Sequence, residues 1–347
     1  MGLFDNFRRD KSSDKVEKPS DENVSRETSR VEEGNDVSRE TSEEKQEVTH
    51  ASETEIALNA EVIQRDIYPA EQPPVEPGAI KSYRDKKPVM HAIGTTKIIS
   101  IINQKGGVGK STTAINLSAA LGEQGKQVLL VDLDPQGNAT SGLGVEKSQL
   151  ENCVYDVLLD DLPIEEVIIP DVCEGLDLVP ATINLAGAEV ELVSEMAREN
   201  RLKDAVGKMR GKYDFIFIDC PPSLGLLTVN SLVAANKLII PIQTEFYALE
   251  GVTKLLESMK RVKNRLNPML DIYGILLTMY DGRTTLSRQV AAEVRNYFDR
   301  QVFETIIPRT VKLSEAPSYG IPITQYDPQG KGAIAYTNLA KEVIQRG

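Results

Sequence analysis

Residues 98–113 read IISIINQKGGVGKSTT and decide the fold. The first six form a short, largely β-branched apolar run, as expected for a strand buried on both faces of a sheet. Glycines follow at once, and from residue 112 the segment TTAINLSAALGEQ has helical character. Backbone N–H groups of a glycine-rich turn and the positive end of the next helix attract anions. The stretch predicts a strand, a phosphate-binding loop and a helix, in that order.

Two side chains indicate what the loop binds. Lys110 would reach the β- and γ-phosphates of a nucleotide, and the Ser111 hydroxyl would ligate Mg²⁺. The common pattern G-x-x-x-x-G-K-[ST] has a glycine where this chain has Gln104, and Lys105 follows that position. The loop therefore fits a variant, K-G-G-x-G-K-[ST], with a second lysine. We predict ATP and Mg²⁺ as cofactors.

Further short apolar runs alternate with helix-length segments along the chain. They read QVLLVDLD (127–134), DFIFIDC (214–220), KLIIPI (237–242) and IYGILLTMY (272–280). This alternation is typical of parallel strands joined by crossover helices. We predict one α/β domain over residues 96–347, a doubly wound, mostly parallel sheet flanked by helices.

Three aspartates follow two of these predicted strands. Asp219 ends the run 214–220 beside the loop, where a carboxylate would hold Mg²⁺ through water. Asp132 and Asp134 end the run 127–134. Because side chains alternate along a strand, these two share a face, and geometry alone does not divide their roles.

The composition excludes several kinds of chemistry. The only histidines, His50 and His91, precede the predicted domain, which argues against a histidine base or a histidine-ligated zinc. The three cysteines form no C-x-x-C pair, so a cysteine metal site or a disulfide framework is not expected. Isolated thiols, no signal peptide and no apolar run of about 20 residues predict a cytoplasmic protein.

Residues 1–95 differ from the rest of the chain. They hold 21 Asp and Glu against 14 Lys and Arg, with few apolar residues before Ile56. Such a segment buries too little to offset its ordering entropy, so we predict a disordered arm. Residues 53–66 have helical character, and the opening 1–9 is too short for a membrane anchor. The net charge of −12 does not settle nucleic-acid binding, because an acidic protein can carry a local basic surface.

Three motifs, taken together, resemble those of a known family. Residues 105–112 (KGGVGKST) are similar to the deviant Walker A loop of the ParA/MinD group of P-loop ATPases. Residues 132–138 (DLDPQGN) and 219–222 (DCPP) resemble that group's D-x-D-P-Q-G-N element and its Walker B motif, at the ends of successive predicted strands. The segments 178–193, 243–251, 277–290 and 308–323 narrow the resemblance to the ParA/Soj partitioning ATPases, over roughly residues 96–347.

The resemblance implies roles for individual residues. Asp134 would orient the attacking water, Asp132 would support the metal side or the switch, and Asp219 and Ser111 would complete the metal site. Lys105 would cross into a second subunit and contact its nucleotide, in an ATP-dependent sandwich dimer. The catalytic set is thus Asp134, Lys105 and Lys110. The nucleotide contacts are Lys105, Gly106, Gly107, Val108, Gly109, Lys110, Ser111, Thr112 and Pro308.

DNA binding is also implied by the resemblance. The family's partitioning members bind DNA without sequence preference through basic residues of the C-terminal half, and the matching positions here are Arg283 and Lys312. Four further arginines would extend this surface or simply be solvated: Arg288, Arg295, Arg300 and Arg309. A ParB-like centromere-binding protein would stimulate hydrolysis and release the DNA, so the expected location is the cytoplasm, on the nucleoid.

Two other classes compete with this interpretation. A MinD-like membrane-cycling ATPase would end in a basic amphipathic helix, whereas residues 336–347 (YTNLAKEVIQRG) predict a packed helix. A metabolic or metallocluster enzyme on the same fold is the third class, and its cluster-binding members need paired cysteines.

A pentapeptide, VSRET, occurs twice, at residues 24–28 and 37–41. The simpler interpretation is chance repetition in a segment of low sequence complexity. Its codons can also spell the palindrome GTTTCACGTGAAAC, which resembles the centromere-like parS site bound by ParB proteins. The nucleotide sequence of the gene decides between the two, because other codons would end the second hypothesis.

Overall fold

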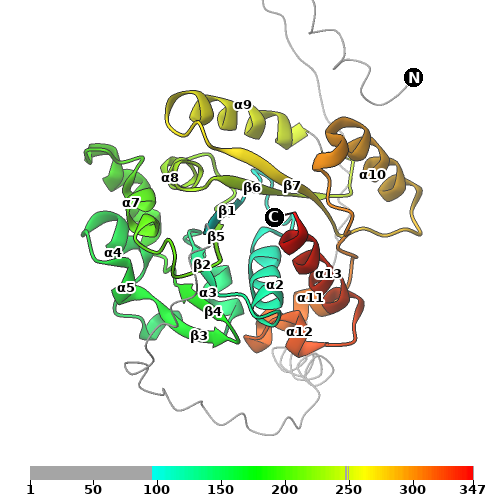
Figure 1. The fold of residues 1–347 in the computed structure, drawn as a ribbon, viewed down its shortest axis with the longest axis horizontal. Coiled ribbons are helices and arrows are strands. Elements are labelled where there is room, and N and C mark those ends of the chain that lie inside the picture. The colour runs from blue at the N-terminus through cyan, green and yellow to red at the C-terminus, as the bar shows by residue number, and fades with distance from the viewer. Residues whose placement is uncertain (1–95, 247, 249, 347) are drawn as a thin grey trace, which may run out of the picture. The chain divides into compact units, whose positions relative to one another are not determined.

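The computed structural model of this 347-residue chain describes residues 96–246, 248 and 250–346. These residues form one seven-stranded sheet with helices on both faces (Figure 1). The predicted arm (1–95), its helical segment (53–66) and the repeated pentapeptide lie outside the described residues. Within the described part of the chain, no helix combines the length and apolarity needed to cross a membrane.

The sheet has the strand order β3-β4-β2-β5-β1-β6-β7. All its pairings are parallel except that of β3 with β4. The strands are β1 (Lys97–Ile101), β2 (Val128–Asp132), β3 (Ile169–Cys173), β4 (Leu176–Val179), β5 (Phe215–Asp219), β6 (Lys237–Gln243) and β7 (Asp271–Thr278).

Two groups of helices cover the two faces of the sheet (Figure 1). One face carries α2 (Lys110–Gly122), α3 (Asn138–Gly142), α11 (Lys312–Glu315), α12 (Ile323–Tyr326) and α13 (Lys331–Gln345). The other carries α4 (Val154–Leu159), α5 (Ile164–Val167), α6 (Leu185–Glu191), α7 (Arg201–Gly207), α8 (Leu226–Ala234), α9 (Glu250–Arg265) and α10 (Thr285–Phe298).

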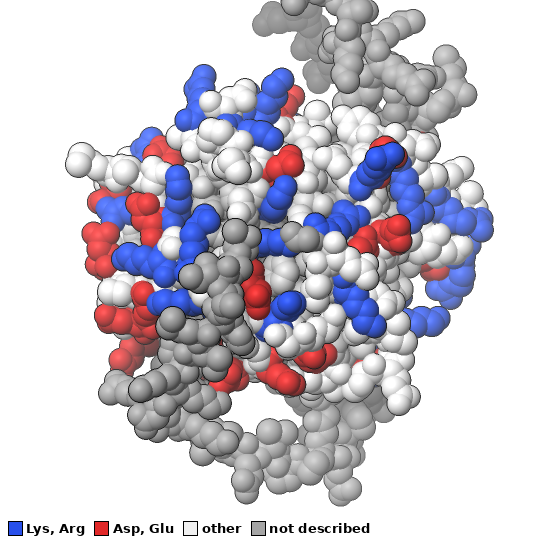
Figure 2. All heavy atoms as spheres, in the orientation of Figure 1, with Lys and Arg blue, Asp and Glu red and all other residues white. Residues whose placement is uncertain are grey.

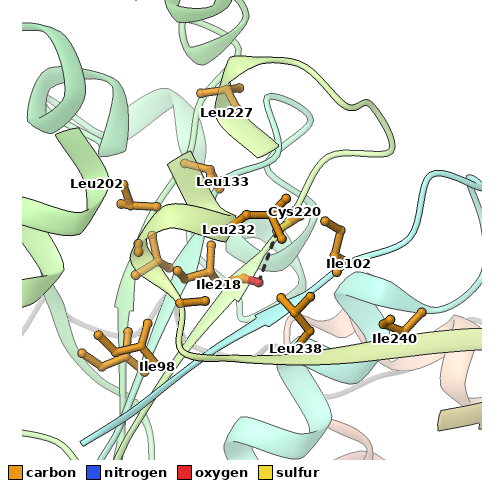
Figure 3. Packing of buried hydrophobic residues seen from close by; sticks show 14 of the residues in the cluster. Ile98, Ile102, Leu133, Leu202, Ile218, Cys220, Leu227, Leu232, Leu238 and Ile240 are labelled. Carbon is orange, nitrogen blue, oxygen red and sulfur yellow. Dashed lines mark hydrogen bonds between the residues drawn. The ribbon is translucent and has the colours of Figure 1, made fainter. Parts of the chain in front are cut away.

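The core is divided by the sheet because strand side chains alternate between its faces. Ile98 packs with the α8 face, and its neighbour Ile99 packs with the α2 face. Figure 3 shows the first of these cores, where Ile218 and Leu238 of the strands meet Leu232 of α8. Burial on both faces explains why the central strands read as continuous apolar runs in the sequence.

The structure confirms the predicted fold and corrects it in two places. The five apolar runs correspond to β1, β2, β5, β6 and β7, but β3 and β4 were not predicted. These two short strands contain Pro170, Asp171 and Asp177, so they lack the apolar run that identified the others. Since they lie between β2 and β5 in the chain, the three motifs do not follow successive strands. They follow β1, β2 and β5, which are neighbours in the sheet.

Candidate nucleotide site and basic surface

The glycine loop between β1 and α2 is tied to the ends of two other strands. The Asn103 side-chain amide donates to the Pro241 carbonyl of β6 at 2.7 Å, and its oxygen accepts from the Lys105 amide at 3.0 Å. The Thr278 hydroxyl, at the end of β7, donates to the Val108 carbonyl at 2.8 Å. These contacts hold the loop at the carboxyl edge of the sheet, the usual ligand site in open parallel sheets.

The loop backbone presents free donors. Gly107 and Gly109 have φ values of +73° and +91°, which side-chain-bearing residues rarely adopt. A Cβ atom on Gly106 or Gly107 would meet nothing within 4 Å, so the loop faces open space. Within the described part of the chain, the amides of residues 106–109 donate no hydrogen bond. Unpaired amides in a glycine turn that begins a helix suit an anion such as phosphate.

Lys110 lies at the start of α2 and is 7% exposed. Its Nζ donates to the Lys105 carbonyl at 3.4 Å. Burial lowers the pKa of Lys110, while the nearby carboxylates of Asp219 and Asp134 act in the opposite direction. A buried ammonium group beside unpaired amides is well placed to bind a charged phosphate, because its attraction to an anion is stronger away from bulk water.

Asp219 ends β5 and is completely buried. Neither of its carboxylate oxygens has a hydrogen-bond partner among the described residues. Burial raises the pKa of Asp219 well above its usual range, and the charge of Asp132 raises it further, against the effects of Ser111 and Lys110. An unpartnered buried carboxylate beside a serine hydroxyl is a chemically suitable pair for Mg²⁺, which prefers oxygen ligands.

Asp132 and Asp134 have different surroundings. Asp132 ends β2, is completely buried, and accepts hydrogen bonds from the Thr140 amide, the Thr140 hydroxyl and the Asp134 amide. Burial raises the pKa of Asp132 to about 6, although these hydrogen bonds act to lower it. Asp134 lies beyond the strand, is 6% exposed, and accepts from the Gln136 amide at 3.0 Å. The structure thus distinguishes Asp132 from Asp134 by position and hydrogen bonding, which the alternation of side chains along a strand could not do.

A cavity of about 490 Å³ adjoins the loop. Gly109 and Thr112 line it on the loop side, and Pro308 lines it from the segment after β7, together with Val311 and Tyr336. The structure therefore brings Pro308 next to the loop. A partly enclosed space beside the loop is suited to the base and sugar of a nucleotide.

Lys105 points to a different environment from Lys110. Its Nζ lies 3.8 Å from a carboxylate oxygen of Glu245, in the segment after β6, and the two side chains are 37% and 47% exposed. The Gln243 side-chain amide also donates to Glu245 at 2.6 Å. An exposed ion pair of this kind is weak, so Lys105 can exchange Glu245 for another anion at little cost.

The residues predicted to bind DNA lie on the surface of the C-terminal third of the chain. Figure 2 shows Lys and Arg side chains gathered over α10, at the right of the view. Arg283 is 90% exposed and paired with Asp281 at 2.7 Å, and Lys312 is 51% exposed and paired with Glu315 at 2.9 Å. The four further arginines are also exposed: Arg288, Arg295, Arg300 and Arg309.

Three residues of the site were missed by sequence reasoning. Thr278 anchors the loop, Thr140 holds Asp132, and Glu245 pairs with Lys105. Thr278 and Glu245 lie inside segments that carried the family resemblance, and Thr140 lies two residues after the D-x-D-P-Q-G-N element. Their nearness to the motifs was the available signal, but threonine and glutamate side chains are too common at such positions to be assigned roles.

These features define a class of protein. A mostly parallel sheet whose first strand runs into a glycine loop with free amides, a buried lysine and a strand-end carboxylate is the site of a P-loop nucleoside triphosphatase.

Comparison with known proteins narrows the class. A family model described as an AAA domain matches residues 96–272. The chain is 57% identical over 251 residues to the sporulation initiation inhibitor protein Soj of Bacillus subtilis, covering 72% of this chain and 99% of that protein. It is 53% identical over 250 residues to the chromosome partitioning protein ParA of Myxococcus xanthus, covering 72% and 88%. The chain belongs to the ParA/Soj family of partitioning ATPases.

Two solved structures of similar chains share the fold and hold ADP with magnesium. One is a cobyrinic acid a,c-diamide synthase from Mycobacterium smegmatis with bound ADP and magnesium, 42% identical, with a TM-score of 0.64 and coverage of 72% of this chain and 94% of that one. Another is the septum site-determining protein MinD of Pyrococcus horikoshii with Mg-ADP, 31% identical, with a TM-score of 0.60 and coverage of 72% and 96%.

Proposed function

We propose that this chain is an ATP-dependent DNA-partitioning ATPase. ATP binding drives sandwich dimerisation and non-specific DNA binding, and hydrolysis, stimulated by a ParB-like partner, releases the DNA. The observation that carries the proposal is one loop with two lysines in different settings: Lys110 is buried at the helix start, and Lys105 is held at the surface by a weak ion pair. The family membership supports the same conclusion.

Phosphate binding follows from the loop. The free amides of residues 106–109 and the Lys110 ammonium group hold the phosphates, and the cavity beside Pro308 takes the base. Ser111 and Asp219 would hold Mg²⁺, which neutralises charge on the phosphate oxygens when bound. Phosphoryl transfer depends on positioning and charge rather than on a covalent partner. A site without histidine is therefore sufficient.

Asp134 orients the attacking water. It lies just beyond β2, beside the loop, and its backbone is fixed by the turn that follows. The negative charge on the transferred phosphate is fully neutralised only when Lys105 of a second subunit reaches the site. Intrinsic activity is therefore weak in the monomer, and assembly and hydrolysis are linked, as with an arginine finger supplied in trans.

Lys105 is tested against a matched control. We expect Lys105→Ala to abolish ATP-induced dimerisation, measured by light scattering after size-exclusion chromatography. Glu245→Gln removes the ion pair but keeps the lysine, so this variant should dimerise at least as well as the wild type. Unchanged dimerisation and turnover in Lys105→Ala would contradict the trans role.

The basic surface around Arg283 and Lys312 is the proposed DNA contact. Each side chain is exposed and paired with an acid two or three residues away in sequence, and phosphate replaces that acid on binding. Such contacts are independent of sequence and weaken steeply with salt. The protein would then act in the cytoplasm, on the nucleoid.

A gel shift with a non-specific duplex tests the whole proposal. Retention with ATP, but not with ADP or without nucleotide, is the expected result. The MinD-like alternative, favoured by the Pyrococcus neighbour, predicts ATP-dependent sedimentation with anionic vesicles and no DNA retention. A small-molecule ligase, as the Mycobacterium neighbour is named, predicts neither.

A further inference from the structure

Two aspartates occupy paired positions on neighbouring strands, with Asp132 of β2 opposite Asp219 of β5. Both are completely buried. Asp219 has no hydrogen-bond partner in the described part of the chain, whereas Asp132 accepts three hydrogen bonds. Two side chains of the same type and burial, side by side, therefore differ in whether their oxygens accept hydrogen bonds.

We propose that Asp132 and Thr140 form a positioning pair that holds Asp134 against the nucleotide, and that Asp132 is not a magnesium ligand. The inference rests on the proposed ATPase function, because Asp134 is the residue it serves. The three donors on Asp132 are the Thr140 hydroxyl at 2.7 Å, the Thr140 amide at 2.8 Å and the Asp134 amide at 3.2 Å.

Thr140 joins three segments at one hydroxyl group. The hydroxyl donates to Asp132 at the end of β2 and accepts from the Ala181 amide, just after β4, at 2.9 Å. Thr140 is itself the third residue of α3, and its own amide is one of the donors that a helix start leaves unpaired. Asp132, Thr140 and Ala181 are all fully buried, so water does not compete for these bonds.

The joined segments frame the turn that carries Asp134. The Leu133 amide donates to the Asp219 carbonyl at 2.9 Å, and the Gly137 amide donates to the Asp134 carbonyl at 2.8 Å. With Asp132 bound to the Asp134 amide, the turn is fixed at both ends and in its middle. A carboxylate that orients water loses much of its effect when displaced by about 1 Å, so this support bears directly on catalysis.

The hydrogen bonds also argue against a metal role for Asp132. Both carboxylate oxygens of Asp132 already accept hydrogen bonds, Oδ1 from the Asp134 amide and Oδ2 from the Thr140 amide and hydroxyl, whereas Mg²⁺ takes oxygen ligands that are free to face it. The unpartnered oxygens of Asp219 and the hydroxyl of Ser111 provide those ligands.

Two variants of Thr140 test the pair. Thr140→Val keeps the shape but removes the hydroxyl, and we expect kcat for ATP hydrolysis to fall about 10- to 100-fold, as for other residues that orient catalytic groups. KM for ATP and the Mg²⁺ concentration for half-maximal rate should change by less than about 2-fold. Thr140→Ser restores the hydroxyl, so its kcat should lie within about 3-fold of wild type. If Thr140→Val does not fold, Thr140→Ala replaces it.

The Mg²⁺ dependence separates the two roles of Asp132. In Asp132→Asn a carboxamide faces the Thr140 donors, and we expect kcat to fall while the half-saturating Mg²⁺ concentration is unchanged. An increase in that concentration of about 10-fold or more would assign Asp132 to the metal and overturn the proposal. Unchanged kcat in Thr140→Val would overturn it as well.

Hydrogen exchange measured by mass spectrometry tests the Asp132–Thr140 pair without relying on ATPase activity. In Thr140→Val, amide exchange should rise in residues 133–142 and 180–184 and stay unchanged in α13. If the wild-type chain does not hydrolyse ATP, the proposed function fails, and the pair is judged by this exchange alone. Unchanged exchange in both segments would overturn it.

Discussion

The nucleotide site and the basic surface are built in opposite ways. At the first, Lys110 is buried at the start of α2, and Asp132, Asp134 and Asp219 are buried at or just beyond strand ends. Side-chain hydrogen bonds from Asn103 and to Val108 fix the loop beside them. At the second, the charged side chains are exposed, and Arg283 and Lys312 are bonded to acids close by in sequence. A buried charge interacts strongly because water is excluded, whereas an exposed charge is screened by solvent and salt.

This difference sets the size of the effect that each substitution can have. Removal of one buried charged group should abolish the step that depends on it, nucleotide binding or hydrolysis, since the opposite charges around it are left buried and unpaired. Removal of one exposed charge should only weaken a contact that several residues share. Substitutions in the two regions therefore test the comparison directly.

The largest effect is expected at Lys110. Lys110→Ala removes the only ammonium group that lies buried in the described loop, so ATP affinity should fall about 100-fold or more. Titration with a fluorescent ATP analogue measures it. Lys341→Ala, which removes an exposed lysine of α13, is the control and should bind as wild type. Nucleotide affinity within the range of the control would show that the amides alone hold the phosphates.

A middle-sized effect is expected at Arg283. Arg283→Glu reverses one exposed charge per subunit, so DNA affinity should fall about 10- to 100-fold at low salt, with a shallower dependence on salt. ATP binding and dimerisation should not change, because the side chain is 90% exposed and its bonds go to Asp281 rather than to the loop. Fluorescence anisotropy with a labelled duplex at several salt concentrations measures both effects.

The control for Arg283 makes the same reversal elsewhere. Lys203 is exposed on α7, which lies at the left of Figure 1, far from α10 and the preceding segment with Arg283 at the right. Lys203→Glu changes the net charge similarly and should leave DNA affinity near the wild-type value. Equal losses in the two variants would mean that net charge, rather than a located surface, controls DNA binding.

The two regions also differ in how far the sequence predicts them. Loop, lysines and strand-end aspartates were predictable because each motif is continuous in sequence and follows an apolar run. Thr140 was not, because its role depends on Asp132 and Ala181, which only the fold brings together. The strands β3 and β4 escaped notice for a related reason: they lie toward one side of the sheet, β3 at its edge, and mix apolar with charged residues.

For the basic surface, the sequence identified charges but not their partners. The pairing of Arg283 with Asp281 spans two residues of a turn, where periodicity predicts nothing. The sequence left two roles open for the four further arginines, DNA contact or simple solvation. Their exposed position in the structure agrees with both roles. A surface site is defined by its ligand, so its extent is learned by measurement.

The smallest effect is expected at Asp281, which accepts hydrogen bonds from the Arg283 guanidinium at 2.9 and 2.7 Å. These bonds lower the pKa of Asp281 to about 2, so it is ionised at neutral pH and competes with DNA phosphate for Arg283. Asp281→Asn should raise DNA affinity about 2- to 5-fold at low salt, and less at high salt.

Asp299→Asn is the matched control for that gain, because it removes one exposed acid from the same third of the chain without contacting Arg283. Both variants remove one negative charge. Any difference in DNA affinity between them, measured by anisotropy of the labelled duplex, therefore reports the competition of Asp281 with DNA for Arg283. If Asp281→Asn gains no more affinity than Asp299→Asn, the intrachain pair does not limit DNA binding. The exposed region would then act through its summed charge, and the contrast with the individually fixed charges of the nucleotide site would be sharper still.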